Sequence, residues 1–168
     1  VVILRGKILA AVDASKLFYQ PEGHLVTIDI ATRKVIDKCN LQGQPDSVAL
    51  DKMGRNIVVV LENQRDEALN KGAIPQLPAG NVTILPIKNG VPDCTGAHPI
   101  DLTGLAEIAP TDPEPEFVKV NAKGMAVVSL QENNHLVLID VAKRQVVRHF
   151  SAGSVNLKQV DLKRDGVI

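Results

Sequence analysis

Acidic and amide side chains recur at matching positions of a repeated segment. Two stretches of 19 residues, Pro45 to Asn63 and Pro115 to Asn133, align without a gap. Each begins with proline and an acid, has glycine near its middle and ends in Glu-Asn. Carboxylate and amide oxygens brought together from separate strand ends are the ligands that Ca²⁺ requires, typically six to eight around one ion. The repeat therefore predicts a site for a hard cation.

The candidate site residues come from this repeat and from the insertion that follows its first copy. We predict calcium ligands at Glu62, Asp66, Glu67, Glu114, Glu116 and Glu132. Arg65 and Lys71, in the insertion from Gln64 to Gly80, are predicted to contact an anionic substrate. A bound cation at such a place can hold a phosphate or polarise its ester bond. The alternatives are that the acids and amides cap strand ends and that the insertion is a structural flap.

Short strands are predicted to position these side chains. Each half of the repeat is typical of a short strand, with a glycine-containing turn between the halves. A second pair of similar segments, His24 to Asp37 and His135 to Arg148, indicates strand, polar turn and strand. The middle copy is Asn81 to Val91, where Asn89-Gly90 is the turn signal. Strand, turn, strand, loop, strand, turn, strand is a four-stranded antiparallel meander, as in a propeller blade.

The predicted fold class is therefore all-β, a β-propeller fragment of about three four-stranded antiparallel blades. We assign the whole chain, 1–168, to one partial propeller, with blade segments at 1–41, 42–102 and 103–160. The tail 161–168 is predicted to lead toward a next blade. Because natural propellers close with about four to eight blades, the expected partner is the remainder of the ring. It would come from the same precursor or from another chain.

Composition excludes several other classes of protein. Apolar residues make up 45% of the chain, whereas aromatic residues make up only 2%, which favours strands of branched aliphatic residues. Lys plus Arg equals Asp plus Glu at 19 each, and no basic stripe indicates nucleic acid or a membrane surface. No stretch approaches the roughly 20 apolar residues of a membrane span. The two cysteines, Cys39 and Cys94, are either a disulfide of an exported protein or free core thiols.

Several motifs resemble one bacterial family. Pro-Asp-Ser-Val, Glu-Asn-x-Arg-Asp-Glu, Asp-Pro-Glu-Pro-Glu-Phe-Val and Leu-Gln-Glu-Asn-Asn-His are similar to motifs of phytase-like β-propellers, described as having esterase-like activity of phytase. That family is related to large surface-anchored propellers, and the resemblance spans roughly residues 23–168. It implies a larger exported protein (secreted, periplasmic or at the cell surface) with bound calcium and hydrolysis of phosphate esters.

Two functions follow from these observations. The leading one is an exported phytase-like propeller that hydrolyses phosphate esters with calcium. The rival is a non-catalytic extracellular surface or matrix propeller that binds protein, glycan or structural calcium, which the absence of an evident nucleophile favours. A dehydrogenase propeller is disfavoured because few aromatic residues exist to stack on a flat cofactor. His24 and His135 occupy equivalent repeat positions, which indicates a structural role for these histidines.

Overall fold

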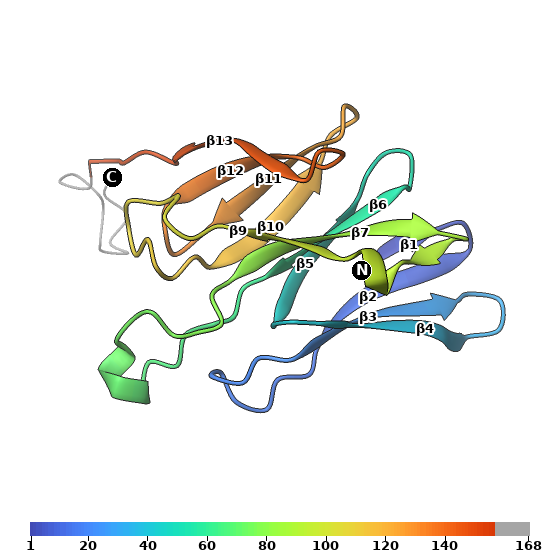
Figure 1. The fold of residues 1–168 in the computed structure, drawn as a ribbon, viewed down its shortest axis with the longest axis horizontal. Coiled ribbons are helices and arrows are strands. Elements are labelled where there is room, and N and C mark those ends of the chain that lie inside the picture. The colour runs from blue at the N-terminus through green and yellow to red at the C-terminus, as the bar shows by residue number, and fades with distance from the viewer. Residues whose placement is uncertain (157–168) are drawn as a thin grey trace, which may run out of the picture.

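Three antiparallel β-sheets follow one another along the chain (Figure 1). A computed structural model describes residues 1–156, so the predicted tail 161–168 and the end of the third blade segment lie outside the described residues. The first sheet contains β1 (Val2–Leu4), β2 (Lys7–Asp13), β3 (Gly23–Asp29) and β4 (Lys34–Leu41). The third sheet contains β10 (Pro115–Val120), β11 (Met125–Leu130), β12 (His135–Asp140) and β13 (Gln145–Ser151). In each of these two sheets, every strand pairs with its neighbours in sequence.

The second sheet has an interrupted fourth strand. Its first three strands are β5 (Pro45–Leu50), β6 (Asn56–Leu61) and β7 (Asn81–Lys88). The fourth position is shared by β8 (Val91–Pro92) and β9 (His98–Asp101), which both pair with β7. A single 3₁₀ turn, η2 (Cys94–Gly96), separates them. Asn89 and Gly90 both have positive φ angles, 53° and 79°, as a tight hairpin turn of this kind requires.

Contacts made by β5 and β10 bring the three sheets together. β5 contacts both β10 and β2, and β10 also contacts β6. The predicted all-β fold of repeated four-stranded antiparallel sheets is therefore confirmed. Apart from η2, the described residues contain one further 3₁₀ segment, η1 (Leu69–Gly72), within the insertion. Among residues 1–156 no helix has the length and hydropathy to cross a membrane.

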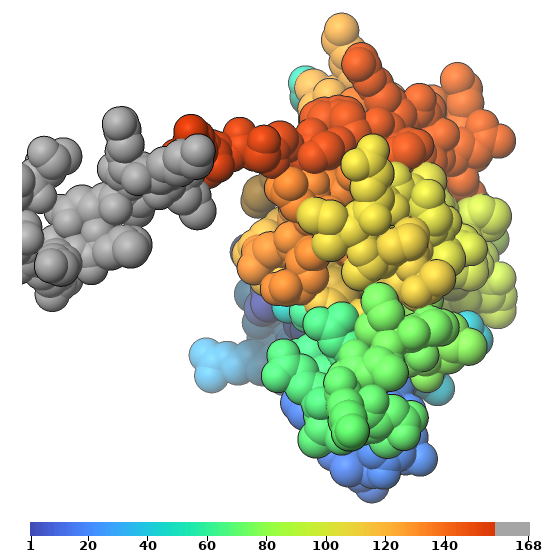
Figure 2. Space-filling model, turned by 90° about the vertical axis from the view of Figure 1, so that its left-hand side faces the viewer, coloured from blue at the N-terminus to red at the C-terminus, as the bar shows by residue number. Residues whose placement is uncertain are grey.

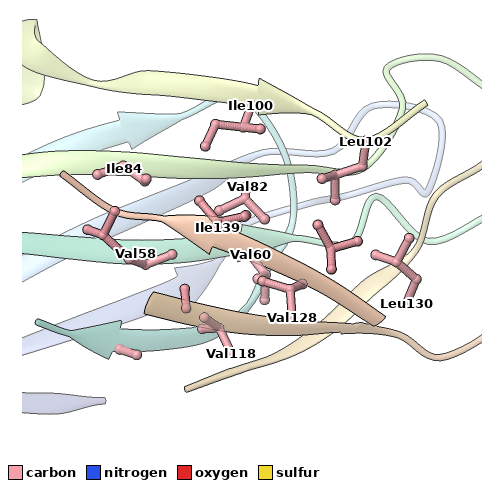
Figure 3. Close-up of a cluster of buried hydrophobic side chains, with 14 of the residues drawn as sticks. Val58, Val60, Val82, Ile84, Ile100, Leu102, Val118, Val128, Leu130 and Ile139 are labelled. Atoms are coloured by element: carbon pink, nitrogen blue, oxygen red, sulfur yellow. The ribbon is translucent and has the colours of Figure 1, made fainter. Parts of the chain in front are cut away.

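The second sheet is buried on both faces, and this explains its nearly continuous apolar strands. On one face, Ile57 and Val59 join a cluster with Leu9 and Leu25 of the first sheet. The other face carries a second cluster shared with the third sheet (Figure 3), whose labelled members are Val58, Val60, Val82, Ile84, Ile100, Leu102, Val118, Val128, Leu130 and Ile139. Full burial of one such side chain contributes about 1.5–3 kcal/mol. The two clusters hold the strand ends in fixed positions.

A disulfide joins the outer strand of the first sheet to η2, the turn that interrupts the outer strand position of the second sheet. Cys39 in β4 and Cys94 in η2 are bonded, with their Cα atoms 5.2 Å apart. Of the two alternatives that the sequence left open, the structure therefore shows the disulfide. The bond closes a sequence separation of 55 residues, and this constrains the unfolded chain.

Candidate functional site

Two β-bulges place acids at the starts of neighbouring inner strands. In β5 the register shifts between Pro45 and Ser47, so that Asp46 is the extra residue. In β10 it shifts in the same way between Pro115 and Phe117, which makes Glu116 the extra residue. A bulge redirects a side chain out of the regular alternation of a strand. The repeat therefore presents one bulged acid from each of two adjacent sheets.

Glu62 completes a group of three carboxylates. It follows the last residue of β6, and its carboxylate oxygen lies within 4.8 Å of those of Asp46 and Glu116. We call Asp46, Glu62 and Glu116 the acid triad. Glu62 and Glu116 belong to the predicted ligand set, whereas Asp46 does not. The alignment of Asp46 with Glu116 in the repeat is the signal that identifies Asp46 as a member.

The acid triad changes the protonation of its own members. Burial raises the pKa of Glu62 to about 7, and the charges of Glu116, Asp46, Glu114 and Glu132 add to that increase. Burial also raises the pKa of Glu116, with further contributions from Asp46 and Glu132. Burial alone raises the pKa of Asp46. These carboxylates repel one another, and a cation between them would relieve that repulsion.

A cavity of about 450 Å³ opens beside the acid triad. Glu62 belongs to its wall, together with Phe18, Gln64, Arg65, Asp66, Glu67, Ala68, Glu114 and Glu132. An adjoining cavity of about 280 Å³ shares Phe18, Gln64 and Asp66 with it and also contains Lys16. The loop between β6 and β7 (green) and the loop between β9 and β10 (yellow) gather on this side of the molecule (Figure 2). Sequence reasoning did not single out Phe18, which lies outside every repeat.

Arg65 lines the cavity but has a carboxylate partner. Its Nη1 donates to Asp112 Oδ2 at 2.8 Å, and the Asp112 side chain is only 5% exposed. The ion pair connects the two loops that gather around the cavity. Glu114 is buried beside it: burial raises the pKa of Glu114, the Asp112 charge raises it further, and Arg65 opposes the increase. Arg65 therefore stabilises buried carboxylates in the described structure.

The remaining predicted site residues have different surroundings. Asp66 uses Oδ1 to accept the backbone N–H groups of Ala68 and Leu69 at 2.9 and 3.3 Å, while Glu67 lies exposed in the cavity wall. Glu132 is an exposed member of that wall. Lys71 is exposed in η1 and does not belong to the wall. Contact between Lys71 and a substrate stays a prediction.

Asn63 and Asn133, which end the two copies of the repeat, have a structural role. Asn133 is 1% exposed, and its Nδ2 donates to the carbonyl oxygens of Ile108, Ala109 and Asp112. Its Oδ1 accepts the backbone N–H of Glu114 at 3.0 Å. Asn63 repeats the pattern in the second sheet, where it holds the backbone of 44, 78 and 79. For these two amides the strand-capping alternative describes the observed hydrogen bonds.

The acid triad fits a calcium ion by chemistry and by spacing. Ca²⁺ binds oxygen ligands at about 2.3–2.6 Å, so two ligands of one ion lie within about 5 Å of each other. The triad oxygens lie within 4.8 Å of one another. Glu114 and Glu132 stand close enough to raise the pKa of Glu62 through their charges. Three carboxylates still leave several positions of a calcium coordination sphere for water or ligand.

Comparison with known proteins supports the fold. No family model matches the chain, and no curated protein matches it. Hydrazine synthase of Kuenenia stuttgartiensis is similar over 82% of this chain and 38% of its own, with a TM-score of 0.58 and 15% identity. The Dos1 propeller is similar over 91% of this chain and 37% of its own, with a TM-score of 0.52 and 11% identity.

The chain has the β-propeller fold. The three repeated antiparallel sheets and the similarity to the Dos1 propeller agree on this assignment. The chain spans less than two fifths of the length of either solved structure. At this level of identity the likeness establishes the fold alone, so activity and ligand must be argued from the site.

Proposed function

We propose that this propeller binds Ca²⁺ at the acid triad and uses it to bind and hydrolyse phosphate esters in the cavity of about 450 Å³ beside the triad. The observation that carries the proposal is the meeting of three carboxylates, from two neighbouring sheets, within 4.8 Å. The resemblance of the motifs to phytase-like propellers supports the choice of substrate class. The activity of the intact protein is part of this proposal, because the chain spans only part of its structural neighbours.

In this proposal, different residues of the chain bind the cation and transfer the proton. Asp46, Glu62 and Glu116 hold the cation, and the β-bulges keep the two sheet-borne acids pointed at it. When bound, Ca²⁺ supplies positive charge that attracts a phosphate and lowers the pKa of a coordinated water. Glu67 and Glu132, exposed in the cavity wall, are the acids available to accept or donate a proton there. Without a cation the same wall repels an anion.

The disulfide supports a location outside the cytoplasm. Stable disulfides form mainly in oxidising compartments, and the Cys39–Cys94 bond links two sheets of this chain. We therefore propose that the protein is secreted, periplasmic or exposed at the cell surface. The family resemblance implies the same location.

One observation favours the non-catalytic alternative. Arg65, predicted to attract the substrate phosphate, is paired with the buried Asp112 at 2.8 Å. Lys71 lies outside the cavity wall. The basic side chain that remains available to a phosphate is therefore Lys16, which lines the adjoining cavity. A propeller that binds calcium structurally, and a protein or glycan beside it, needs neither a free arginine nor a general base.

Calorimetry and turnover measured together distinguish these functions. The intact protein is titrated with Ca²⁺ and assayed with phytate and p-nitrophenyl phosphate, with and without a chelator. We expect one bound ion and turnover that the chelator abolishes. A double variant, Glu62→Gln with Glu116→Gln, should lose both, whereas Glu22→Gln, a surface change on the β2–β3 loop, should lose neither.

The possible failures point to different corrections. Calcium binding without turnover of any phosphate ester contradicts the hydrolase and leaves the non-catalytic propeller. Absence of calcium binding contradicts the metal site itself and reduces the acid triad to a set of strand-end carboxylates.

A further inference from the structure

A pair of histidines on the third sheet lies apart from the acid triad and has no part in the proposed function. His135 Nε2 and His149 Nδ1 are 3.0 Å apart, and their ring centroids are separated by 5.2 Å. His135 is 6% exposed at the start of β12, whereas His149 is exposed on β13. One imidazole is therefore fixed by the core and the other is open to solvent.

The repeat alone does not account for this pair. In the third sheet Val137 pairs with His149, and in the first sheet the equivalent Val26 pairs with Lys38. His24 and His135 are equivalent, but only the third sheet has a second imidazole beside the first. Shared ancestry of the blades thus explains His135 and leaves His149 to be explained.

The spacing of the two nitrogens matches that of two ligands on one transition metal ion. Two metal–nitrogen bonds of about 2.0–2.1 Å that meet at about 90° span roughly 3 Å. The observed separation is 3.0 Å. Imidazole nitrogens are good ligands for Cu²⁺, Ni²⁺ and Zn²⁺ and poor ones for Ca²⁺. The pair therefore differs from the acid triad in the class of ion that it suits.

The buried ring of the pair is held in the form that binds metal. Burial lowers the pKa of His135, the neighbouring His149 lowers it further, and the charge of Glu107 opposes both. A lowered pKa favours the neutral imidazole, which is the form that binds metal. Two imidazole ligands leave the other coordination positions of such an ion to water.

We propose that His135 and His149 bind a divalent transition metal ion of the copper or zinc class. The ion takes the place of the proton that the two rings share in their hydrogen bond. Binding fastens β12 and β13 to each other. The site is independent of the calcium site and of its chemistry.

Copper(II) is the probe that tests this site. The intact protein is titrated with Cu²⁺ at pH 7.5 in a non-coordinating buffer, and the bound ion is examined by electron paramagnetic resonance. We expect one tightly bound ion whose spectrum contains hyperfine splitting from two nitrogens. His149→Gln should weaken binding by more than about tenfold, because it removes a ligand outright, while even the loss of a group that only orients a ligand costs about 10–100-fold.

Matched variants keep the test decisive. His149 is exposed, so His149→Gln is expected to fold, and circular dichroism checks this. His24→Gln removes the equivalent histidine of the first sheet and should leave copper binding unchanged. No tight copper binding by the wild type, or equal affinity in folded His149→Gln, would overturn the proposal. Calcium binding retained in His149→Gln would show that this result concerns the histidine site alone.

Discussion

At the scale of single residues, Glu62 has the pKa that the site raises most. Its pKa of about 7 arises first from burial and then from four neighbouring acids. The folded protein therefore binds a proton at Glu62 more tightly than the unfolded chain does. The contribution of this group to stability is fully present below its ordinary pKa of about 4.5 and is lost as the pH rises toward and beyond 7.

Replacement of Glu62 by glutamine should remove this loss. Without calcium, we expect Glu62→Gln to be more stable than the wild type at pH 8 by about 1–2 kcal/mol, a figure reduced for solvent screening of a half-buried group. At pH 4.5 the two proteins should be nearly equal, because the wild-type carboxyl is protonated there. Urea unfolding in the presence of a chelator at both pH values measures the difference. Equal stability at pH 8 would contradict the charge repulsion within the acid triad.

The Arg65–Asp112 pair gives a second prediction at this scale. Arg65→Met leaves a carboxylate that is 5% exposed without its partner, and we expect a loss of about 2–3 kcal/mol in the free energy of unfolding. The double variant Arg65→Met with Asp112→Asn should recover part of that loss, since no buried charge remains. Urea denaturation of both proteins gives the comparison. A double variant no more stable than Arg65→Met would contradict the assignment of the loss to an unpaired Asp112.

The sequence predicts the acids better than it predicts their partners. The repeat identifies Glu62 and Glu116 because both recur at fixed places in aligned segments. It does not reveal the Arg65–Asp112 pair, which joins residues 47 positions apart. The sequence also predicts a substrate contact for Lys71 from its charge alone. The insertion that contains Lys71 lies outside the repeat, so the repeat does not predict where that side chain lies. Long-range contacts of loops depend on the packed sheets, and no local pattern contains that information.

At the scale of elements, the two copies of the repeat differ by one residue. The hairpin of the second sheet pairs Leu50 with Ile57, whereas the hairpin of the third sheet pairs Val120 with Ala126. The third-sheet hairpin is therefore one residue shorter, although the sequences align without a gap. The third sheet has its compensating extra residue after β11. Glu62 therefore follows β6 directly, whereas one residue separates Glu132 from the end of β11. This displacement explains why Glu62 is half-buried and Glu132 is exposed.

The hydrogen bonds by which Asn133 joins its strand end to the neighbouring loop should be sensitive to mutation. Asn133→Ala removes four hydrogen bonds of a side chain that is 1% exposed and leaves buried carbonyl groups without partners. We expect a loss of about 2–4 kcal/mol by urea unfolding. Asn134→Gly is the matched control: Asn134 is exposed and has a φ of 49°, which glycine adopts freely. Its effect should stay within about 0.5 kcal/mol, and an equal loss in both variants would contradict the role of Asn133.

At the scale of the whole molecule, the first and third sheets each have one face that no other described sheet covers. Val58 of the second sheet is fully buried, but its structural equivalent Val127 of the third sheet is 37% exposed. Phe117, on the same sheet, is 59% exposed, and the two residues line one small apolar hollow. An apolar sheet face of this kind in a propeller is the surface on which a further blade packs. We therefore expect the remainder of a ring to cover it.

A charge on that face tests the expectation. If a further blade covers the third sheet in the intact protein, Val127→Asp should lower the free energy of unfolding by about 2 kcal/mol or more, because it buries an unpaired charge. Met53→Asp is the control, since Met53 is 62% exposed in a hairpin outside the sheet faces. Thermal or urea unfolding of the intact protein measures both. Equally small effects from the two variants would contradict a covered third sheet.

Calorimetry at two pH values tests calcium binding at the acid triad. Because the pKa of Glu62 is about 7, the ion must displace a proton at pH 6 but not at pH 8. We expect one calcium ion to bind more tightly at pH 8 than at pH 6, with proton release at pH 6 seen as a dependence of the enthalpy on the buffer. Calcium affinity that is the same at both pH values, or no binding at either, would contradict calcium binding by the acid triad.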